Sequence, residues 1–96
     1  PNFSHNLAAA DRFRAFAAER GQSPAALAIA WVLHRSPQIV AIPGTRSADH
    51  LDDHADAMAI TLSAEDMAAI EAVLPVGFAH GDRYSDAQSV GPERYC

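Results

Sequence analysis

The chain has no lysine, because all seven of its basic residues are arginine. These 96 residues alone therefore cannot carry out a reaction that needs a catalytic lysine. Cys96 is the only cysteine, so no disulfide framework can form, and a reducing compartment such as the cytoplasm is expected. No apolar run approaches the roughly 20 residues of a membrane span, and no signal peptide opens the sequence. No membrane partner is expected.

Basic residues are also outnumbered, which gives a net charge of −5. This balance argues against nucleic acid as a partner, since nucleic-acid binding favours clustered Lys and Arg. An apolar content of 49% in 96 residues fits one compact unit. The sequence opens on Pro1 and not on methionine, so we expect a piece of a longer protein.

Two helices are predicted first. Residues 6–20 have apolar residues at helical spacing and end at Arg20-Gly21, a typical helix terminus. Ser23-Pro24 then starts a second helix over 24–35, with the serine as N-cap. This helix is apolar almost all round, so it should be buried on more than one side, with Trp31 in the core.

The segment QIVAI, residues 38–42, predicts a strand. Five nearly uninterrupted apolar residues, mostly β-branched, are typical of a strand covered on both faces of a parallel sheet, and Pro43-Gly44 ends it. One strand cannot make a sheet, because its backbone groups would lack partners. The prediction is therefore a sheet completed by other chain.

Two more helices are predicted, over 48–57 and 64–74. Ser63 and Asp66 have the spacing of a capping box ahead of the last one. From residue 75 onward, Gly, Pro, Asp and Ser recur without periodicity, which indicates an irregular tail.

His50 and His54 raise the question of a metal site, since they stand four residues apart on a predicted helix. Helical zinc motifs place Glu directly after the first His and need a third ligand, whereas Leu51 stands there and is needed as a core contact. Two solvated histidines on an acidic helix explain the pattern better, and no metal is expected.

An anion site is the stronger interpretation of residues 43–54. A strand that leads through Gly44 and Thr45 into a helix places unpaired N–H groups where the helix dipole favours negative charge. The Thr45 hydroxyl can donate a hydrogen bond, and Arg46 offers a planar fork suited to phosphate. An ordinary turn with a solvated arginine explains the spacing alone equally well.

Several stretches, taken in order and spacing, resemble the aldo-keto reductases. They are PNFSHNLAAADRFRAFAAERG, SPAALAIAWVLHRSPQIVAIPGTRSADHLDDHADA, ITLSAEDMAAIEAVLP and GDRYS. The resemblance implies an α/β fold, the C-terminal portion of a (β/α)8 TIM barrel that is incomplete as a standalone barrel. Residues 24–35 would be its seventh helix and 38–42 its eighth strand. The whole chain would be one segment, divided into 1–37 (helical), 38–42 (strand), 43–57 (cofactor loop and helix), 64–74 (helix) and 75–96 (tail).

The resemblance also implies a cofactor, NADPH. In the family, the loop and helix after the eighth strand hold the adenosine 2′-phosphate and the adenine. Carried over to this chain, the cofactor-binding residues are Gly44, Thr45, Arg46, His50, Asp53 and His54. His54 departs from the family pattern, which usually has Asn at this position to hydrogen-bond the adenine edge.

The family's reaction reduces aldehydes and ketones to alcohols by hydride transfer from the nicotinamide. It relies on a Tyr, Lys, Asp and His in the first half of the barrel. Tyr84 and Tyr95 match no catalytic position, so the chain alone is expected to be inactive and to need the other half for its carbonyl substrate. Phe78, His80 and Tyr84 are candidate substrate contacts from the tail.

Two alternatives stay open, a truncated non-catalytic pseudo-reductase and a small helical interaction module. Outside its barrel the chain would expose the apolar flank of residues 25–33 and both edges of 38–42. We therefore expect it to be partly molten, or to associate with itself or with a complementary N-terminal fragment.

Overall fold

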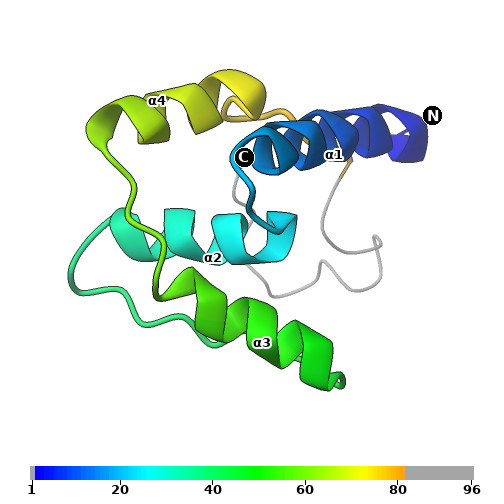
Figure 1. Cartoon of the computed structure of the whole chain (residues 1–96). Helices are drawn as coiled ribbons and strands as arrows, with labels where there is room; N and C mark the ends of the chain where they lie inside the picture. Colours follow the sequence, from blue (N-terminus) through cyan, green and yellow to red (C-terminus); the bar gives the residue numbers. More distant parts are fainter. Residues whose placement is uncertain (1, 82–96) are drawn as a thin grey trace, which may run out of the picture.

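The computed structural model describes residues 2–81. It contains four helices over this range: α1 (Asn2–Glu19), α2 (Pro24–His34), α3 (Ala48–Ala57) and α4 (Ala64–Val73). Figure 1 shows α1 and α4 on one side of α2 and α3 on the other. None of the described helices is both long and apolar enough to cross a membrane.

The predicted α/β class is wrong for this structure, because residues 2–81 contain no strand. Residues 38–42 lie instead in the irregular connection between α2 and α3. Within the described range, Val40, Ala41 and Ile42 make no backbone hydrogen bond to the protein. A strand exists only when a neighbour accepts and donates along its edge, and no described segment does so. Residues 2–81 therefore do not form the predicted portion of a TIM barrel with an eighth strand.

The helix boundaries follow the local signals. Gly21 has φ of 68°, and the Gln22 N–H donates to the Ala17 carbonyl at 3.0 Å, so the chain leaves α1 through a left-handed glycine, as predicted. Ser23 is the N-cap of α2 and accepts from the Ala26 N–H at 3.0 Å. The capping box of Ser63 and Asp66 is present at the start of α4. These three predictions are confirmed.

A small apolar core joins α1, α2 and α4. Leu27 of α2 is fully buried at its centre. Around it lie residues from α1, from α2 itself, from α4 and from the segment before α4, namely Phe13, Ala17, Ala30, Leu62 and Ile70. The third helix, α3, packs along α2 and buries only Ala57. Most of α3 therefore faces solvent.

His34 connects the end of α2 to the segment before α4. Its Nδ1 lies 2.7 Å from the Ala30 carbonyl oxygen, and its Nε2 lies 3.2 Å from the Leu62 backbone nitrogen. An amide N–H can only donate, so Nε2 accepts and the proton of the neutral ring resides on Nδ1, where it donates to Ala30. One imidazole thus satisfies two backbone groups from different elements.

Candidate functional site

The start of α3 leaves backbone donors open. Its N-cap, Ser47, has extended backbone angles, but its side chain makes no capping hydrogen bond. The first intrahelical bond runs from the Leu51 N–H to the Ser47 carbonyl at 3.1 Å. The N–H groups of Ala48, Asp49 and His50 precede that bond and have no intrahelical acceptor. The positive end of the helix dipole therefore meets solvent through unpaired donors.

Thr45 organises the turn that leads into this helix end. Its hydroxyl accepts from the Ser47 N–H at 3.2 Å and donates to the Ser47 carbonyl at 3.0 Å. This side chain is therefore already engaged on its own backbone, in a local pattern common to Ser and Thr in turns. For the Thr45 hydroxyl to donate to a ligand, it would have to release the Ser47 carbonyl.

Gly44 and Arg46 flank Thr45, and both are exposed. A Cβ added to Gly44 would meet no atom within 4 Å, and Gly44 is not among the described glycines with positive φ. In this conformation neither the backbone nor a neighbour requires glycine there. Arg46 takes part in no salt bridge within the described range, unlike Arg14, Arg20 and Arg35. Its guanidinium is thus available to an anion.

The remaining candidates lie on the first two turns of α3. His50 is exposed, whereas Asp53 and His54 are half-buried. His50 and His54 are four residues apart in one helix, so their side chains share a face. The six residues predicted from the sequence are thus adjacent in one loop and helix, as their spacing requires.

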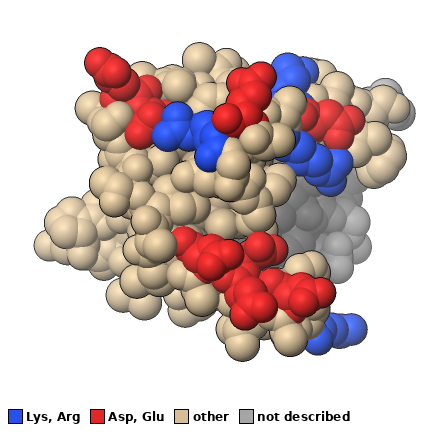
Figure 2. Space-filling model, viewed as in Figure 1, with Lys and Arg blue, Asp and Glu red and all other residues tan. Residues whose placement is uncertain are grey.

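Acidic side chains surround this helix. Of the ten residues in α3, Asp49, Asp52, Asp53 and Asp56 are aspartates, and Figure 2 shows acidic side chains gathered over α3. Asp49 lies in the first turn, where a carboxylate interacts favourably with the helix dipole and competes with any bound anion. Across residues 2–81, no three His, Cys, Asp or Glu side chains come together in a way that could hold a metal ion.

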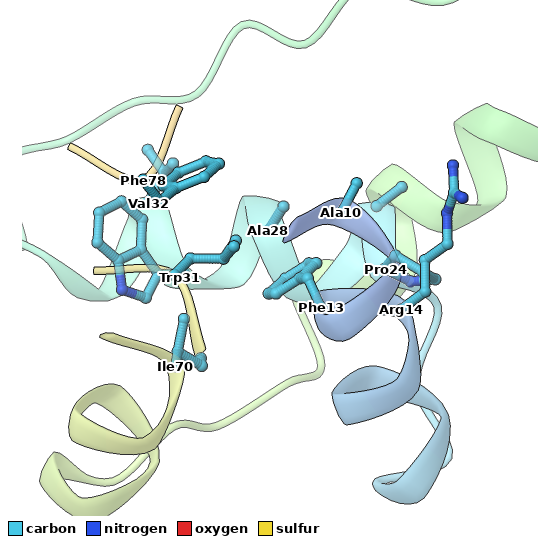
Figure 3. Close-up of a pocket in the computed structure, with 11 residues that line it drawn as sticks. Ala10, Phe13, Arg14, Pro24, Ala28, Trp31, Val32, Ile70 and Phe78 are labelled. Atoms are coloured by element: carbon cyan, nitrogen blue, oxygen red, sulfur yellow. The ribbon is translucent and has the colours of Figure 1, made fainter. Parts of the chain in front are cut away.

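A second feature is an apolar groove of about 490 Å³, which the sequence did not indicate (Figure 3). It lies between α1, α2, the end of α4 and Phe78, and Arg14 is its one charged lining residue. Its walls are formed by Ala10, Phe13, Arg14, Pro24, Ala25, Ala28, Trp31, Val32, Ile70, Leu74 and Phe78. Trp31 was predicted in the core, but it is half-buried at this groove, with the Arg35 guanidinium 5.1 Å from its ring centroid.

A clasp between the first turn of α1 and residues 78–80 borders the groove. The rings of His5 and His80 stack with centroids 3.4 Å apart and planes 4° from parallel. Asn6 donates to the His80 carbonyl at 2.9 Å and accepts from the His80 N–H at 2.8 Å. His5 Nε2 lies 2.8 Å from the carbonyl oxygen of Phe78.

These contacts give a structural role to two of the three tail residues singled out from the sequence. Phe78 lines the groove, and His80 is held by α1. Tyr84 lies outside the described residues, as does Tyr95. The contacts of His5, Asn6 and His34 were not foreseen, because each partner lies far along the chain, 28 residues away for His34 and 73 or 74 for the other two.

Comparison with known proteins identifies the family. The sequence profile of the Aldo/keto reductase family matches residues 1–75. A curated relative, probable aldo-keto reductase 1 of Glycine max, is 36% identical over 83 residues. That match covers 86% of this chain but only 24% of the relative. No solved structure matches the chain significantly. The chain belongs to the aldo/keto reductase family, a family of oxidoreductases, and spans about a quarter of the length of this relative.

Proposed function

We propose that this chain is part of an NADPH-dependent reductase of aldehydes and ketones, and that it supplies the adenosine side of the cofactor site. Gly44, Thr45 and Arg46 would lie at the 2′-phosphate, and the histidines of α3 at the 2′-phosphate and adenine. Family membership supports the reaction class, since the family profile covers residues 1–75. Because the chain spans 24% of its relative, the reaction itself belongs to the longer protein.

The observation that carries the proposal is the open start of α3 beside Arg46, which forms no salt bridge with any of residues 2–81. Free N–H groups at a helix N-terminus and a guanidinium without a carboxylate partner are both suited to phosphate. The guanidinium fork can bind two oxygens at once, which a lysine cannot do. The donor set therefore fits a phosphate monoester such as the 2′-phosphate of NADPH.

The adenine side rests on Asp53 and His54. An imidazole can donate or accept one hydrogen bond from each ring nitrogen, and a carboxylate can accept from the adenine amino group. Asp53 and His54 are half-buried against the rest of the molecule, so a base held there would lose part of its water shell. In this proposal His50 lies toward the phosphate and His54 toward the base.

The aspartates of α3 set the expected strength of this site. Their negative charge opposes an incoming phosphate, whereas Arg46 and the helix dipole attract it. Binding should therefore depend strongly on the charge of Arg46. The catalytic Tyr, Lys, Asp and His of the family have no counterparts here, so the nicotinamide and the carbonyl substrate would bind to the other part of the protein. The chain alone should not oxidise NADPH in the presence of an aldehyde.

Calorimetric titration with adenosine 2′,5′-bisphosphate tests the proposal directly, with adenosine 5′-monophosphate as the control ligand. We expect the bisphosphate to bind more tightly, because only it carries the 2′-phosphate. Arg46→Gln should weaken the bisphosphate about tenfold or more, given that a charge-assisted hydrogen bond contributes roughly 1.5–3 kcal/mol. The affinity for the monophosphate should hardly change.

Arg12→Gln is the matched control variant. Arg12 is also exposed and makes no salt bridge within the described residues, but it lies on α1, away from the start of α3. Equal losses for both variants would mean that general charge, and not a site, attracts the ligand. If the folded chain binds neither nucleotide, the adenosine site does not exist in these residues.

A non-catalytic helical module is the second candidate, and it is favoured by the four helices and small core of residues 2–81, which contain no strand. Under this alternative the chain would function by contacting another protein and not by binding a nucleotide. The coding sequence upstream of residue 1 separates the two candidates. Continuation into a half that carries the family's Tyr, Lys, Asp and His supports the reductase.

A further inference from the structure

His34 is the histidine of residues 2–81 that contacts backbone through both of its ring nitrogens. Its Nδ1 donates to the Ala30 carbonyl at 2.7 Å within α2, and its Nε2 accepts from the Leu62 N–H at 3.2 Å. Leu62 belongs to the segment between α3 and α4, residues 58–63. The imidazole therefore ties this segment to the last turn of α2.

The two partners of this contact differ in their access to water. His34 is exposed, so its ring can exchange protons with the solvent. Leu62 is only 7% exposed and belongs to the apolar core with Leu27 and Ile70. The next residue, Ser63, is the N-cap of α4. A change of charge on the exposed ring is thus transmitted to a buried residue and to the start of a helix.

Protonation of His34 removes the acceptor of this contact. A neutral imidazole accepts through one ring nitrogen, whereas an imidazolium carries a hydrogen on both. Nε2 would then present an N–H to the N–H of Leu62, and two donors repel each other. The bond to Ala30 survives, because Nδ1 donates in both states. The Leu62 N–H loses its acceptor beside the core, which costs free energy until the segment moves to reach water.

None of the described carboxylates pairs with His34 and compensates for this loss. No residue from 57 to 64 is charged, and His34 forms no ion pair within residues 2–81. Beside it on α2, Arg35 pairs with Glu71 of α4 at 3.1 Å, and its positive charge disfavours a second one nearby. On α3, which packs along α2, the half-buried titratable side chains are Asp53 and His54. The other titratable residues of α3 and α4 are exposed or already paired, namely Asp49, His50, Asp52, Asp56, Glu65 and Asp66.

We propose that His34 is a proton-operated latch. The neutral ring holds residues 58–63 against α2, and the protonated ring releases them. The release falls in the range between about pH 7 and about pH 5, where histidine changes its charge near physiological conditions. It is separate from the proposed cofactor site, because the latch involves neither Arg46 nor the start of α3. It also precedes any effect of the carboxyl groups, which titrate at lower pH.

Hydrogen exchange of the Leu62 amide in the full 96-residue chain, followed by NMR, tests the proposal. The protection factor, which corrects for the pH dependence of exchange itself, should fall about fivefold or more between about pH 7 and about pH 5. His34→Gln should abolish this fall, because the glutamine side chain has a carbonyl oxygen that can accept but does not titrate. His54→Gln is the matched control, since it removes a titratable ring on the neighbouring helix α3, and it should retain the fall.

The nitrogen chemical shifts of the His34 ring provide a second readout in the unaltered chain, so the test does not depend on the folding of a variant. At about pH 7 they should show the proton on Nδ1 and a bare Nε2, and at about pH 5 a proton on both nitrogens. A neutral ring with its proton on Nε2 would overturn the proposal. So would a protection factor that does not fall, an equal fall in a folded His34→Gln, or the loss of the fall in His54→Gln.

Discussion

Asp66 takes part in three interactions, two of them through its carboxylate. It accepts from the Ser63 N–H at 2.9 Å, its own N–H donates to the Ser63 hydroxyl at 3.1 Å, and it pairs with Arg20 at 2.9 Å. The backbone hydrogen bond from Ser63 is the largest effect on the pKa of Asp66, and it lowers the pKa below its ordinary value of 3.8. Desolvation, the second-largest effect, opposes this shift, and the Ser63 hydroxyl and Arg20 each lower the pKa by smaller amounts. The ion pair between Asp66 and Arg20 joins α4 to the end of α1.

This lowered pKa gives a pH prediction. A carboxyl group with a lower pKa in the folded state stabilises the fold above its unfolded pKa, and that contribution is lost as the pH falls through the folded pKa. Asp66→Asn should therefore reduce the free energy of unfolding at about pH 7, and the difference from the wild type should vanish at about pH 2. Urea unfolding followed by circular dichroism measures this difference in the free energy of unfolding at each pH. Glu65→Gln on the same helix is the control, and a difference that does not vary with pH would refute the prediction.

At the same scale, His34 makes a long-range hydrogen bond that the sequence could not predict. Its place in the last turn of α2 was clear, but its acceptance of the Leu62 N–H depends on a residue 28 positions away. A histidine at a helix end has several local uses, and nothing in its neighbours selects this one. Contacts of this kind depend on the packing of whole helices.

Among the elements, the helices were predictable because their signals are local. Gly21, Ser23 and the Ser63–Asp66 box act within one turn of the residues that they cap, so their effect does not depend on the remainder of the fold. The six candidate cofactor residues lie together for the same reason, since they are neighbours in one loop and one helix, and their role in cofactor binding stays a prediction. The spacing of His50 and His54 alone determines that they share a face.

The strand over 38–42 failed for the opposite reason. Its β-branched residues favour extended backbone, and the alternating exposure of residues 39–42 retains that preference. A strand also needs a hydrogen-bonded neighbour, and no local pattern can supply one. The sequence analysis wrongly assigned these residues to a strand in a sheet completed by other chain.

The open end of α3 leads to a prediction for that helix. Ser47→Asp places a carboxylate at an N-cap whose present side chain makes no capping bond, and it should stabilise α3 by up to about 1 kcal/mol. Hydrogen exchange of residues 48–57 should become slower. The same carboxylate would occupy the donors that we assign to phosphate, so binding of adenosine 2′,5′-bisphosphate should weaken. Slower exchange without weaker binding would place the phosphate elsewhere.

For the molecule as a whole, stability rests on very few large side chains. Leu27 is the one large side chain of residues 2–81 that is fully buried, and five of its buried apolar companions are alanines from α1, α2 and α3, with Ala9 among them. A core of this size leaves only a small margin of stability against unfolding, because a short chain buries a modest share of its unfolded surface. Packing between helices should therefore be sensitive to any loss of volume at the centre.

Leu27→Ala tests this margin. Truncating a fully buried leucine costs roughly 2–5 kcal/mol, which should unfold most of the chain or lower its melting temperature sharply. Thermal unfolding followed by circular dichroism at low protein concentration measures the effect. Val40→Ala removes apolar volume at an 84% exposed position and should change the melting temperature little. Similar curves for both variants would indicate that the core is fluid and not closely packed.

The clasp between His5, Asn6 and His80 has a topological consequence. It closes a loop of more than seventy residues, so the described chain forms a ring whose ends hold each other. Bringing such distant positions together costs chain entropy, and the stacked rings and hydrogen bonds must repay it. A protease that removed the first two turns of α1 would therefore act at a distance: it would release the segment around Phe78, more than seventy residues away, and with it one wall of the groove.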